Sequence, residues 1–372
     1  MSQYTQERPP INYTHVKYDI PLSEHPLGPT FPQTNGSLQV FGDLDPLVTL
    51  MAPKDNTTVL ADWIYTDKAQ LGLHIVSFTD TTLVTLSWLH TLLDALGRKA
   101  LLGAWTAMLE GREDDVPEFW GYDFDPLEKL GVSREEGEEE EFVLKPHRIQ
   151  GLSFFKFVFN YLWEVFFYPA EVGRYVCMPH SYFSTIKQQA FRDLSSAPES
   201  LLTLDTRDPA NPKPFLSDGD TLCAWFTRLL ARTNSTIATS PSTRTISIMN
   251  VFGMRDLLST TSPQLLPRGK AYIANCAVGI TSLFSQGELV GGGGMPLGHV
   301  AARLRRDLVT QGTRTQVEAG QRAVRENGGG AVLYGTGDMA MCVFTNWMKA
   351  RLFETDFSAA IVEEGEGGKE AW

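Results

Sequence analysis

A histidine four residues before an aspartate is the arrangement in this sequence best suited to chemistry by proton transfer. The chain has seven histidines, and it has two such pairs, His15–Asp19 in HVKYD and His90–Asp94 in HTLLD. The composition predicts about 0.4 such pairs by chance. Two pairs exceed that number, but the excess is too small for the spacing alone to identify a catalytic histidine. An imidazole titrates near ~6.5 in model peptides, so it can accept a proton from a hydroxyl or an amine at neutral pH. We interpret His90 as the candidate base.

The elements around His90 favour it over His15. Residues 70–78 and 81–89 are rich in Val, Leu, Ile, Thr and aromatic residues and predict a β-hairpin, and residues 93–109 repeat apolar residues at helical spacing. His90 therefore lies at a strand-to-helix junction, which can hold a side chain rigidly at the end of a sheet. Asp94, at the start of the helix, is stabilised by the helix N-terminus and is predicted to anchor the turn without needing to touch the imidazole.

HVKYD, by contrast, lies in a segment that reaches to about residue 60 and is rich in Pro, Thr and Asn. This composition predicts an extended segment lying on a domain, with no helix or strand to fix His15. We therefore interpret the His15–Asp19 spacing as a coincidence.

The rest of the chain alternates helices with strands without regular βαβ units, which predicts an α/β fold with mixed sheets flanked by helices. Residues 195–217 contain four prolines and predict a linker, so we expect one half at 1–194 and another at 218–372. The other predicted elements are strands at 174–178, 245–252, 271–283, 331–334 and 341–344, and helices at 181–194, at 221–233 after a cap at Ser217 or Asp218, and over most of 299–326.

One stretch, residues 151–168 (GLSFFKFVFNYLWEVFFY), is unusually aromatic. Lys156, Asn160 and Glu164 recur at four-residue spacing, so they share one helical face. We expect an amphipathic helix with its aromatic face against the core. The alternatives are a lid or a membrane-touching surface, and a membrane span is the least favoured.

Composition excludes several classes of protein and site. Hydrophobic residues make up 42% of the chain, enough for a core, and a net charge of −12 without a basic run argues against a nucleic-acid partner. The four cysteines form no CxxC pair, which argues against a disulfide framework and a zinc site. The N-terminus resembles no signal peptide, so we expect a cytoplasmic protein. The acidic stretch 113–146 predicts a solvated loop, and the glycines at 291–294 and 335–337 lack the residues of a phosphate loop.

Three further segments, taken with HTLLDALG, resemble the BAHD acyltransferases of the chloramphenicol acetyltransferase-like superfamily. HTLLDALG resembles the HxxxDG signature, with Ala95 in place of the usual glycine and Gly97 following. NVFGMRDLL resembles the segment whose arginine pairs with the signature aspartate, which implies a pair between Arg255 and Asp94. AYIANC resembles the Tyr-x-Gly-Asn element, with Tyr272 and Asn275 retained and Ala274 replacing glycine.

The last resembling segment is FTNWMKARLFETDF, which is similar to the family's Thr-x-Trp strand followed by the Asp-Phe of DFGWG. It supplies Thr345, Trp347 and Asp356, while the three residues from Ser358 to Ala360 replace Gly-Trp-Gly. In this departure the chain resembles the fungal branch that includes trichothecene acetyltransferase-like proteins. The resemblance spans about residues 60 to 360 in the same order.

The resemblance implies two chloramphenicol acetyltransferase-like domains with an active-site tunnel between them. It implies acyl-CoA as co-substrate, a small-molecule alcohol or amine of secondary metabolism as acceptor, no metal, no bound cofactor and a monomer. His90 would act as base, and Thr345 and Trp347 would stabilise the tetrahedral oxyanion without an acyl-enzyme. Asp94, Arg255, Asn275 and Asp356 would support the site, with Asp356 fixing a loop.

Two alternatives follow from departures from the family pattern. His90 lies nearer the N-terminus than the signature histidine usually does, and only 15 residues follow Phe357, so the chain looks shortened at both ends. The main rival is therefore a truncated or inactive homologue that binds a ligand or partner. Amide formation, as in the condensation domains of peptide synthetases, is less favoured because Leu89 stands where their HHxxxDG motif has its first histidine.

Overall fold

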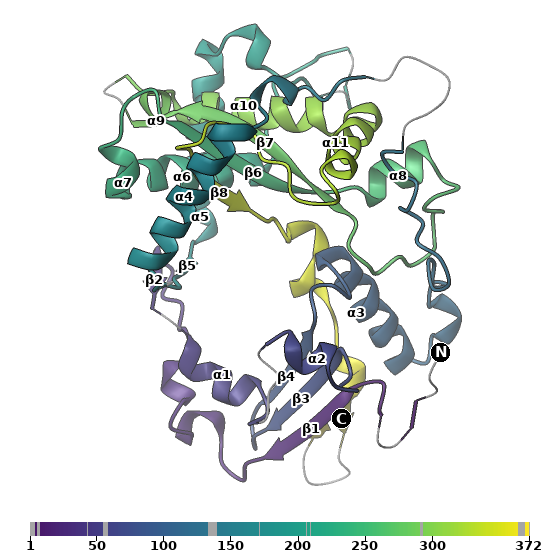
Figure 1. The fold of residues 1–372 in the computed structure, drawn as a ribbon. Coiled ribbons are helices and arrows are strands. Elements are labelled where there is room, and N and C mark those ends of the chain that lie inside the picture. The colour runs from purple at the N-terminus through teal and green to yellow at the C-terminus, as the bar shows by residue number, and fades with distance from the viewer. Residues whose placement is uncertain are drawn as a thin grey trace.

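Two three-stranded mixed sheets form the framework of the computed structural model (Figure 1). It describes the chain apart from residues 1–3, 6–7, 43, 55–58, 133–139, 171, 206, 209, 291–292, 364–368 and 372. In the first sheet β3 (Leu71–Ser77) lies between β1 (Asn12–Lys17), parallel to it, and β4 (Thr82–Trp88), antiparallel to it. In the second, β6 (Thr245–Gly253) lies between antiparallel β7 (Ala277–Ser285) and parallel β8 (Ala340–Phe344). The predicted α/β class with mixed sheets is confirmed.

The part of the chain built on β1, β3 and β4 is the first lobe. The predicted hairpin is present, with Leu71 opposite Trp88 and Ser77 opposite Thr82. The predicted helix follows as α3 (Ala95–Leu109), and α1 (Asp45–Met51) and α2 (Ala61–Ile64) precede the hairpin. A small core of Leu50, Val76 and Phe78 lies under the sheet.

The expectation of an extended N-terminal segment without strands or helices is wrong, because the segment contributes β1 and α1 to the first lobe. His15 lies on β1, where its Nε2 is 2.9 Å from the Ser77 hydroxyl. Nearly every residue of β1 is exposed. An edge strand of this kind carries no alternating apolar pattern for the sequence to show.

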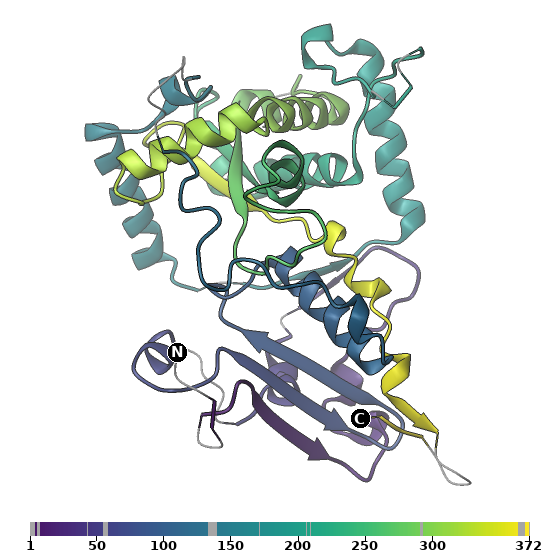
Figure 2. The ribbon, with the colours of Figure 1, turned by 90° about the vertical axis from the view of Figure 1, so that its right-hand side faces the viewer.

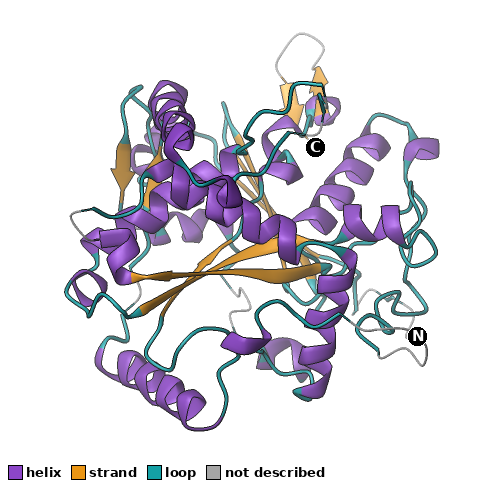
Figure 3. Ribbon diagram, turned by 90° about the horizontal axis from the view of Figure 1, so that it is seen from above, coloured by secondary structure: helices purple, strands orange, loops and turns teal. Residues whose placement is uncertain are grey.

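The second lobe is built on β6, β7 and β8, with helices around the strands, as the view from above shows (Figure 3). Its core includes Ile246, Ile248, Phe284, Leu289 and Val300, all at most 2% exposed. The helices of this lobe are α5 (His180–Asp193), α6 (Asp218–Thr233), α7 (Ser235–Ala238), α8 (Arg255–Thr261), α9 (Gln286–Val290), α10 (Leu297–Gln311) and α11 (Arg314–Glu326). Ser217 caps α6 in a capping box with Asp220.

Helix α5 precedes the predicted linker at 195–217, yet it packs into the core of the second lobe. Ile186 and Ala190 of this helix belong to the same buried cluster as Leu216 and the apolar residues of α10. The second lobe therefore includes residues from both sides of that linker.

Two predicted elements differ from the structure. The strand expected at 271–283 begins only at Ala277, and the strand expected at 331–334 is reduced to an isolated bridge between Tyr334 and Arg148. The prediction that most of 299–326 is helical is confirmed, with a break at Gly312 and Thr313 between α10 and α11, where the Thr313 side chain caps α11 by accepting a hydrogen bond from the Gln316 N–H. Within the acidic stretch 113–146, residues 133–139 lie outside the described residues, as do Gly291 and Gly292.

Helix α4 (Gly151–Phe167) has the predicted boundaries but not the predicted packing. None of its residues is buried, and Leu152, Phe155 and Phe166 are 87%, 69% and 78% exposed. Its contacts are made by the polar face instead: Lys156 pairs with Asp338, and the Asn160 side chain donates to the Gly337 carbonyl. The expectation that the aromatic face packs on the core is therefore wrong, and α4 stands at the edge of the molecule (Figure 2, dark teal, left).

The chain returns to the first lobe after β8. It passes through the short helices η7 (Met348–Ala350), η8 (Leu352–Glu354) and η9 (Ser358–Ala360) and lies along α3 (Figure 2, yellow). Lys99 Nζ donates to the Lys349 carbonyl at 3.3 Å, and the Trp105 and Phe357 rings meet edge to face at 5.0 Å.

The remaining short elements lie outside the two sheets and the site. Strands β2 (Gln39–Phe41) and β5 (Tyr175–Cys177) pair with each other, as do β9 (Ile361–Glu363) and β10 (Lys369–Ala371). The 3-10 helices are η1 (Leu22–Glu24), η2 (Gly28–Thr30), η3 (Glu113–Asp115), η4 (Lys145–His147), η5 (Leu194–Ser196) and η6 (Glu199–Leu201). In the described part of the chain, every helix is too short or too polar to cross a membrane.

Candidate active site

Asp94 is the centre of the hydrogen bonding at the candidate site. Its Oδ1 accepts from the backbone N–H groups of Leu96 and Gly97 and so caps α3. Its Oδ2 accepts from Arg255 Nη1 at 2.8 Å and from the Cys276 N–H at 3.0 Å. One carboxylate thus joins the first turn of α3 in the first lobe to two segments of the second lobe.

The surroundings of Asp94 keep it ionised. Its side chain is 12% exposed, and burial by itself raises the pKa of a carboxyl. The hydrogen bonds from Arg255 and from the Gly97 and Cys276 N–H groups outweigh that effect, so the pKa of Asp94 is lowered. The carboxylate is therefore charged and fully engaged at neutral pH.

Arg255 holds the segment that carries Asn275. Its Nε donates to the Tyr272 carbonyl at 3.0 Å and its Nη2 to the Ala274 carbonyl at 2.6 Å. In a continuing β-strand these two carbonyls would accept hydrogen bonds from a neighbouring strand. Because they accept from Arg255 instead, residues 271–276 are irregular. The predicted partners Asp94 and Arg255, 161 residues apart, lie together.

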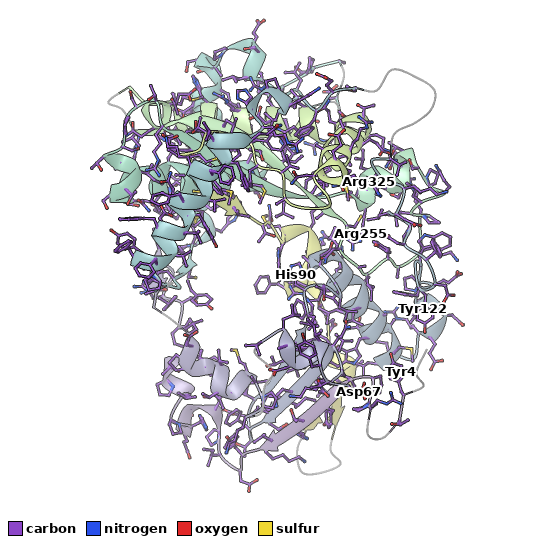
Figure 4. All side chains as sticks on the ribbon, in the orientation of Figure 1. Tyr4, Asp67, His90, Tyr122, Arg255 and Arg325 are labelled. Carbon is purple, nitrogen blue, oxygen red and sulfur yellow. The ribbon has the colours of Figure 1, made fainter. Side chains whose placement is uncertain are left out.

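His90 lies in the turn between β4 and α3, and its side chain is exposed. Asn275 Nδ2 donates to the His90 carbonyl at 2.7 Å, and the Trp88 indole N–H donates to the Leu93 carbonyl at 3.2 Å. Figure 4 places His90 where the two lobes face each other, close to Arg255. The backbone of the turn is thus fixed from both lobes while the imidazole stays accessible to a substrate.

Gly97 is the point of closest approach between α3 and the second lobe. A Cβ atom built at Gly97 would lie 1.9 Å from the Ile273 carbonyl oxygen and 2.7 Å from its carbon. Both atoms belong to backbone, which cannot move aside as a flexible side chain can. Glycine at this position therefore lets Asp94 reach Arg255 and the Cys276 N–H.

We expect Gly97→Ala to destabilise the protein by about 1–3 kcal/mol, since the added methyl group separates α3 from residues 271–276. Gly103→Ala on the same helix is the matched control. A Cβ there meets no atom within 4 Å, and replacing a helical glycine should stabilise by about 0.5–1 kcal/mol. Urea unfolding of both variants measures the difference, and equal stabilities would contradict the assigned close approach.

The two predicted oxyanion donors are adjacent but lie beyond the end of β8. Trp347 Nε1 donates to the Thr345 hydroxyl oxygen at 3.0 Å, and Trp347 is 36% exposed. The bond occupies the indole N–H and leaves the Thr345 O–H free to donate elsewhere.

Arg98 connects Trp347 to the His90 turn. Its Cζ lies 4.2 Å from the centre of the Trp347 ring and 4.9 Å from that of Trp88, so the guanidinium sits between two indoles. Its Nε and Nη2 are buried and find no hydrogen-bond partner among the residues that the structure describes, and burial lowers the pKa of Arg98. Cation–π contacts of this kind hold aromatic rings in place.

Asp356 lies apart from the residues described so far. Its Oδ1 accepts from the Ser358 N–H at 2.8 Å, a hydrogen bond that lowers the pKa of the carboxyl and shapes the turn before η9. The neighbouring Phe357 packs against Trp105 of α3.

Two cavities flank the Asp94–Arg255 pair and share Asp256. One, of about 490 Å³, is lined by Leu96, Lys99, Asp256, Met348, Lys349 and Arg351. The other, of about 230 Å³, is lined by residues around Arg255 and Tyr272, including Trp120, Arg268 and Lys270. His90 lines neither of them.

Two of the four cysteines, Cys223 and Cys276, are poorly suited to act as nucleophiles. Burial raises the pKa of the Cys223 thiol to about 12 and that of Cys276 to about 11, so both stay protonated at neutral pH. All four cysteines are free. Within the described ranges, no group of three or more His, Cys, Asp and Glu side chains is placed to hold a metal ion.

Three residues of the site were not assigned a role from the sequence. Arg98 and Trp88 carry no motif, and the part of their stack made by Trp347 depends on the return of the chain after β8. Gly97 was noted in the sequence, but only the approach of Ile273 shows what it does.

Curated relatives match this chain over nearly its whole length. No protein-family model matches it. The transcriptional regulator calD of Penicillium decumbens is 33% identical, over 98% of this chain and 69% of calD. The acetyltransferase adrJ of Penicillium rubens is 31% identical, over 97% and 69%, and the O-acetyltransferase PaAT-2 of Phomopsis amygdali is 30% identical, over 98% and 72%.

Solved structures match the fold. TRI101 of F. sporotrichioides, complexed with coenzyme A and T-2, matches with a TM-score of 0.57 at 15% identity, over 99% of this chain and 71% of that one. Vinorine synthase matches with a TM-score of 0.51 at 14% identity, over 93% and 64%. At these identities the likeness concerns the fold.

Proposed function

The chain belongs to a family of fungal acyltransferases that includes acetyltransferases and O-acyltransferases, and from this premise we propose that it transfers an acyl group from coenzyme A to a small-molecule acceptor. The acceptor is a hydroxyl, or an amine, of a secondary metabolite. The observation that carries the proposal is the hydrogen-bonded unit of His90, Asp94, Arg255 and Asn275, drawn from three distant segments.

The reaction assigned to this unit needs no covalent enzyme intermediate. His90 accepts the proton of the acceptor hydroxyl as its oxygen attacks the carbonyl carbon of the thioester. The tetrahedral oxyanion collapses, the C–S bond breaks, and the proton passes from His90 to the CoA thiolate. The products are the acylated acceptor and free CoA, so atoms and charge balance.

The other residues of the site position these groups. The Thr345 hydroxyl, which accepts from the Trp347 indole, is the donor we assign to the oxyanion. The Arg98 guanidinium lies between the Trp347 ring and the ring of Trp88, two residues before His90. The proposal includes a tunnel between the halves at 1–194 and 218–372, with donor and acceptor meeting at His90.

The test is CoA release by the purified protein with acetyl-CoA and a panel of hydroxylated acceptors. A thiol reagent measures free CoA, and mass spectrometry measures the acylated acceptor. We expect CoA and acylated acceptor in equal amounts, with little CoA released when the acceptor is omitted. Release of CoA without acylated acceptor would mean thioester hydrolysis and would contradict the proposal.

A second candidate function is ligand or partner binding without catalysis. It is favoured by one observation: calD, which is 33% identical, is named a transcriptional regulator. Under this alternative the protein binds CoA or the acceptor, but no acylated product forms with any member of a broad panel of acceptors. Acyl transfer to any one acceptor would exclude this alternative.

A further inference from the structure

We propose that the 490 Å³ cavity beside α3 binds the phosphate groups of the acyl donor. This inference rests on the proposed function, because that function supplies a CoA thioester as the ligand. It goes further by assigning Lys99, Lys349 and Arg351 as the residues that recognise the anionic part of the donor.

The charge of the cavity is the first argument. Three of its six lining residues are cations and one, Asp256, is an acid, in a chain whose net charge is −12. A local excess of positive charge attracts an anionic ligand. Because the protein as a whole is acidic, most other parts of its surface repel such a ligand.

The cations are not neutralised by strong ion pairs. Lys99 Nζ donates to a neutral carbonyl, that of Lys349. Lys349 Nζ lies 3.5 Å from Asp256 Oδ2, and both side chains are more than 70% exposed. Arg351 forms a similarly exposed ion pair with Glu354. Exposed pairs of this kind are weak, so the cations can exchange their partners for a phosphate.

The size and lining fit an anion attached to an organic group. A volume of 490 Å³ falls in the range of small-molecule pockets, about 300–1,000 Å³, and is larger than an inorganic phosphate needs. Leu96 and Met348 add apolar surface. A nucleotide with its phosphates presents both anionic groups for the cations and an organic group for the apolar surface.

The position of the cavity relates it to the candidate site. Leu96 and Lys99 lie on the first two turns of α3, and at 1.5 Å per residue Lys99 is only about 7.5 Å along the helix from Asp94. Asp256 follows Arg255, the partner of Asp94. Two of the lining residues, Leu96 and Asp256, thus lie within two residues of the partners in the ion pair that fixes the His90 turn.

The backbone around Arg351 is consistent with a ligand site. Arg351 has φ 51° and ψ 41° and joins η7 to η8 in the left-handed region. It is the one non-glycine residue with positive φ among those the structure describes. Strained conformations of this kind concentrate at ligand-binding sites.

The experiment measures CoA binding by calorimetry and the steady-state kinetics of acetyl transfer. The variants are Lys99→Glu, Lys349→Glu and their combination, with Lys213→Glu as control, since Lys213 is exposed and lines neither cavity. We expect the double variant to weaken CoA binding by about ten-fold or more, because charged hydrogen bonds to phosphate are lost. KM for acetyl-CoA should rise by a similar factor, with kcat and the acceptor KM unchanged.

Asp256→Asn provides a prediction of opposite sign. Removing the acid of the cavity should tighten CoA binding by about two- to five-fold, and the gain should shrink as salt screens the charges. 3′,5′-ADP should compete with CoA in wild type, while inorganic phosphate should bind far more weakly.

The outcomes separate this inference from the proposed function. Loss of CoA binding in the double variant, retained in Lys213→Glu, supports the site even if wild type proves to transfer no acyl group. Unchanged CoA binding in the double variant overturns the site, whether or not the enzyme is active. Equal affinity of wild type for CoA and inorganic phosphate also overturns it, because the cavity would then be a general anion site.

Discussion

Replacing His90 with alanine is expected to lower kcat/KM for acyl transfer by about 10²–10⁴-fold, the range that a positioned general base contributes. The imidazole is exposed and its turn is held through backbone groups, by Asn275 and by the Trp88 contact with Leu93. The unfolding midpoint and CoA affinity should therefore change little, so the loss reports chemistry and not folding.

The chain contains a matched control for this variant. His15 also stands four residues before an aspartate, but it lies on β1 and contacts the Ser77 hydroxyl. His15→Ala should keep the full rate of acyl transfer. If His90→Ala retained more than about a tenth of wild-type kcat/KM, the base would have to be another group.

Removing Asp94 is expected to have the largest effect on stability. Asp94→Ala leaves Arg255 with two of its three side-chain hydrogen bonds, those to the Tyr272 and Ala274 carbonyls, and removes the cap of α3. Breaking one side of a fully buried ion pair costs about 3–5 kcal/mol, and this pair is part-buried, so we expect a cost of about 3 kcal/mol. Acyl transfer should fall as well, because the turn that carries His90 loses its attachment to the second lobe. Denaturant unfolding with a parallel CoA-release assay measures both.

A double-mutant cycle with Arg255→Ala separates the ion pair from other effects. The two changes together should cost clearly less than the sum of the single changes, since each already breaks the same bond. Asp356→Ala is the control, because that exposed carboxylate accepts one backbone N–H and its loss should lower the free energy of unfolding far less than the loss of Asp94. Additive costs for Asp94 and Arg255 would show that the pair contributes no coupling.

The same pair gives a pH dependence of known sign. Burial raises the pKa of Asp94, but the bonds from Arg255, Gly97 and Cys276 outweigh it and hold the pKa below its ordinary value. The stabilisation is therefore complete above the unfolded pKa of about 3.9 and is lost as the pH falls through the folded pKa. The difference in unfolding free energy between wild type and Asp94→Ala should stay constant from about pH 5 to 8 and shrink below about pH 4.

Local patterns predicted the parts of the fold that depend on neighbouring residues. The hairpin of β3 and β4 and the helix α3 are visible as alternation and helical spacing, because their pairing and packing involve short sequence separations. β1 was missed because it pairs with a strand about 60 residues away while exposing nearly all its side chains. Periodicity records which residues share a face but not what lies against it.

Helix α4 illustrates that limit. Its spacing correctly indicated that Lys156 and Asn160 share a face, and it could not show that this face meets Asp338 and the Gly337 carbonyl. The partners lie near residue 338, and nothing near residue 156 specifies them.

The candidate site divides in the same way. The role of Asp94 in anchoring the turn followed from its place at the start of a predicted helix, whereas its pairing with Arg255 came from the family resemblance alone. The stack of Trp88, Arg98 and Trp347 left no signal in the sequence, since it forms only when a segment about 250 residues later returns to α3.

That return has a consequence for the order of folding. During synthesis α3 leaves the ribosome long before Lys349 and Phe357, which cover it, have been made. One side of α3 in the first lobe therefore stays uncovered while the whole second lobe is translated. Contacts of such long sequence separation form slowly. The nascent chain carries exposed apolar surface in that interval, and its escape from aggregation depends on chaperones and on how quickly the second lobe folds.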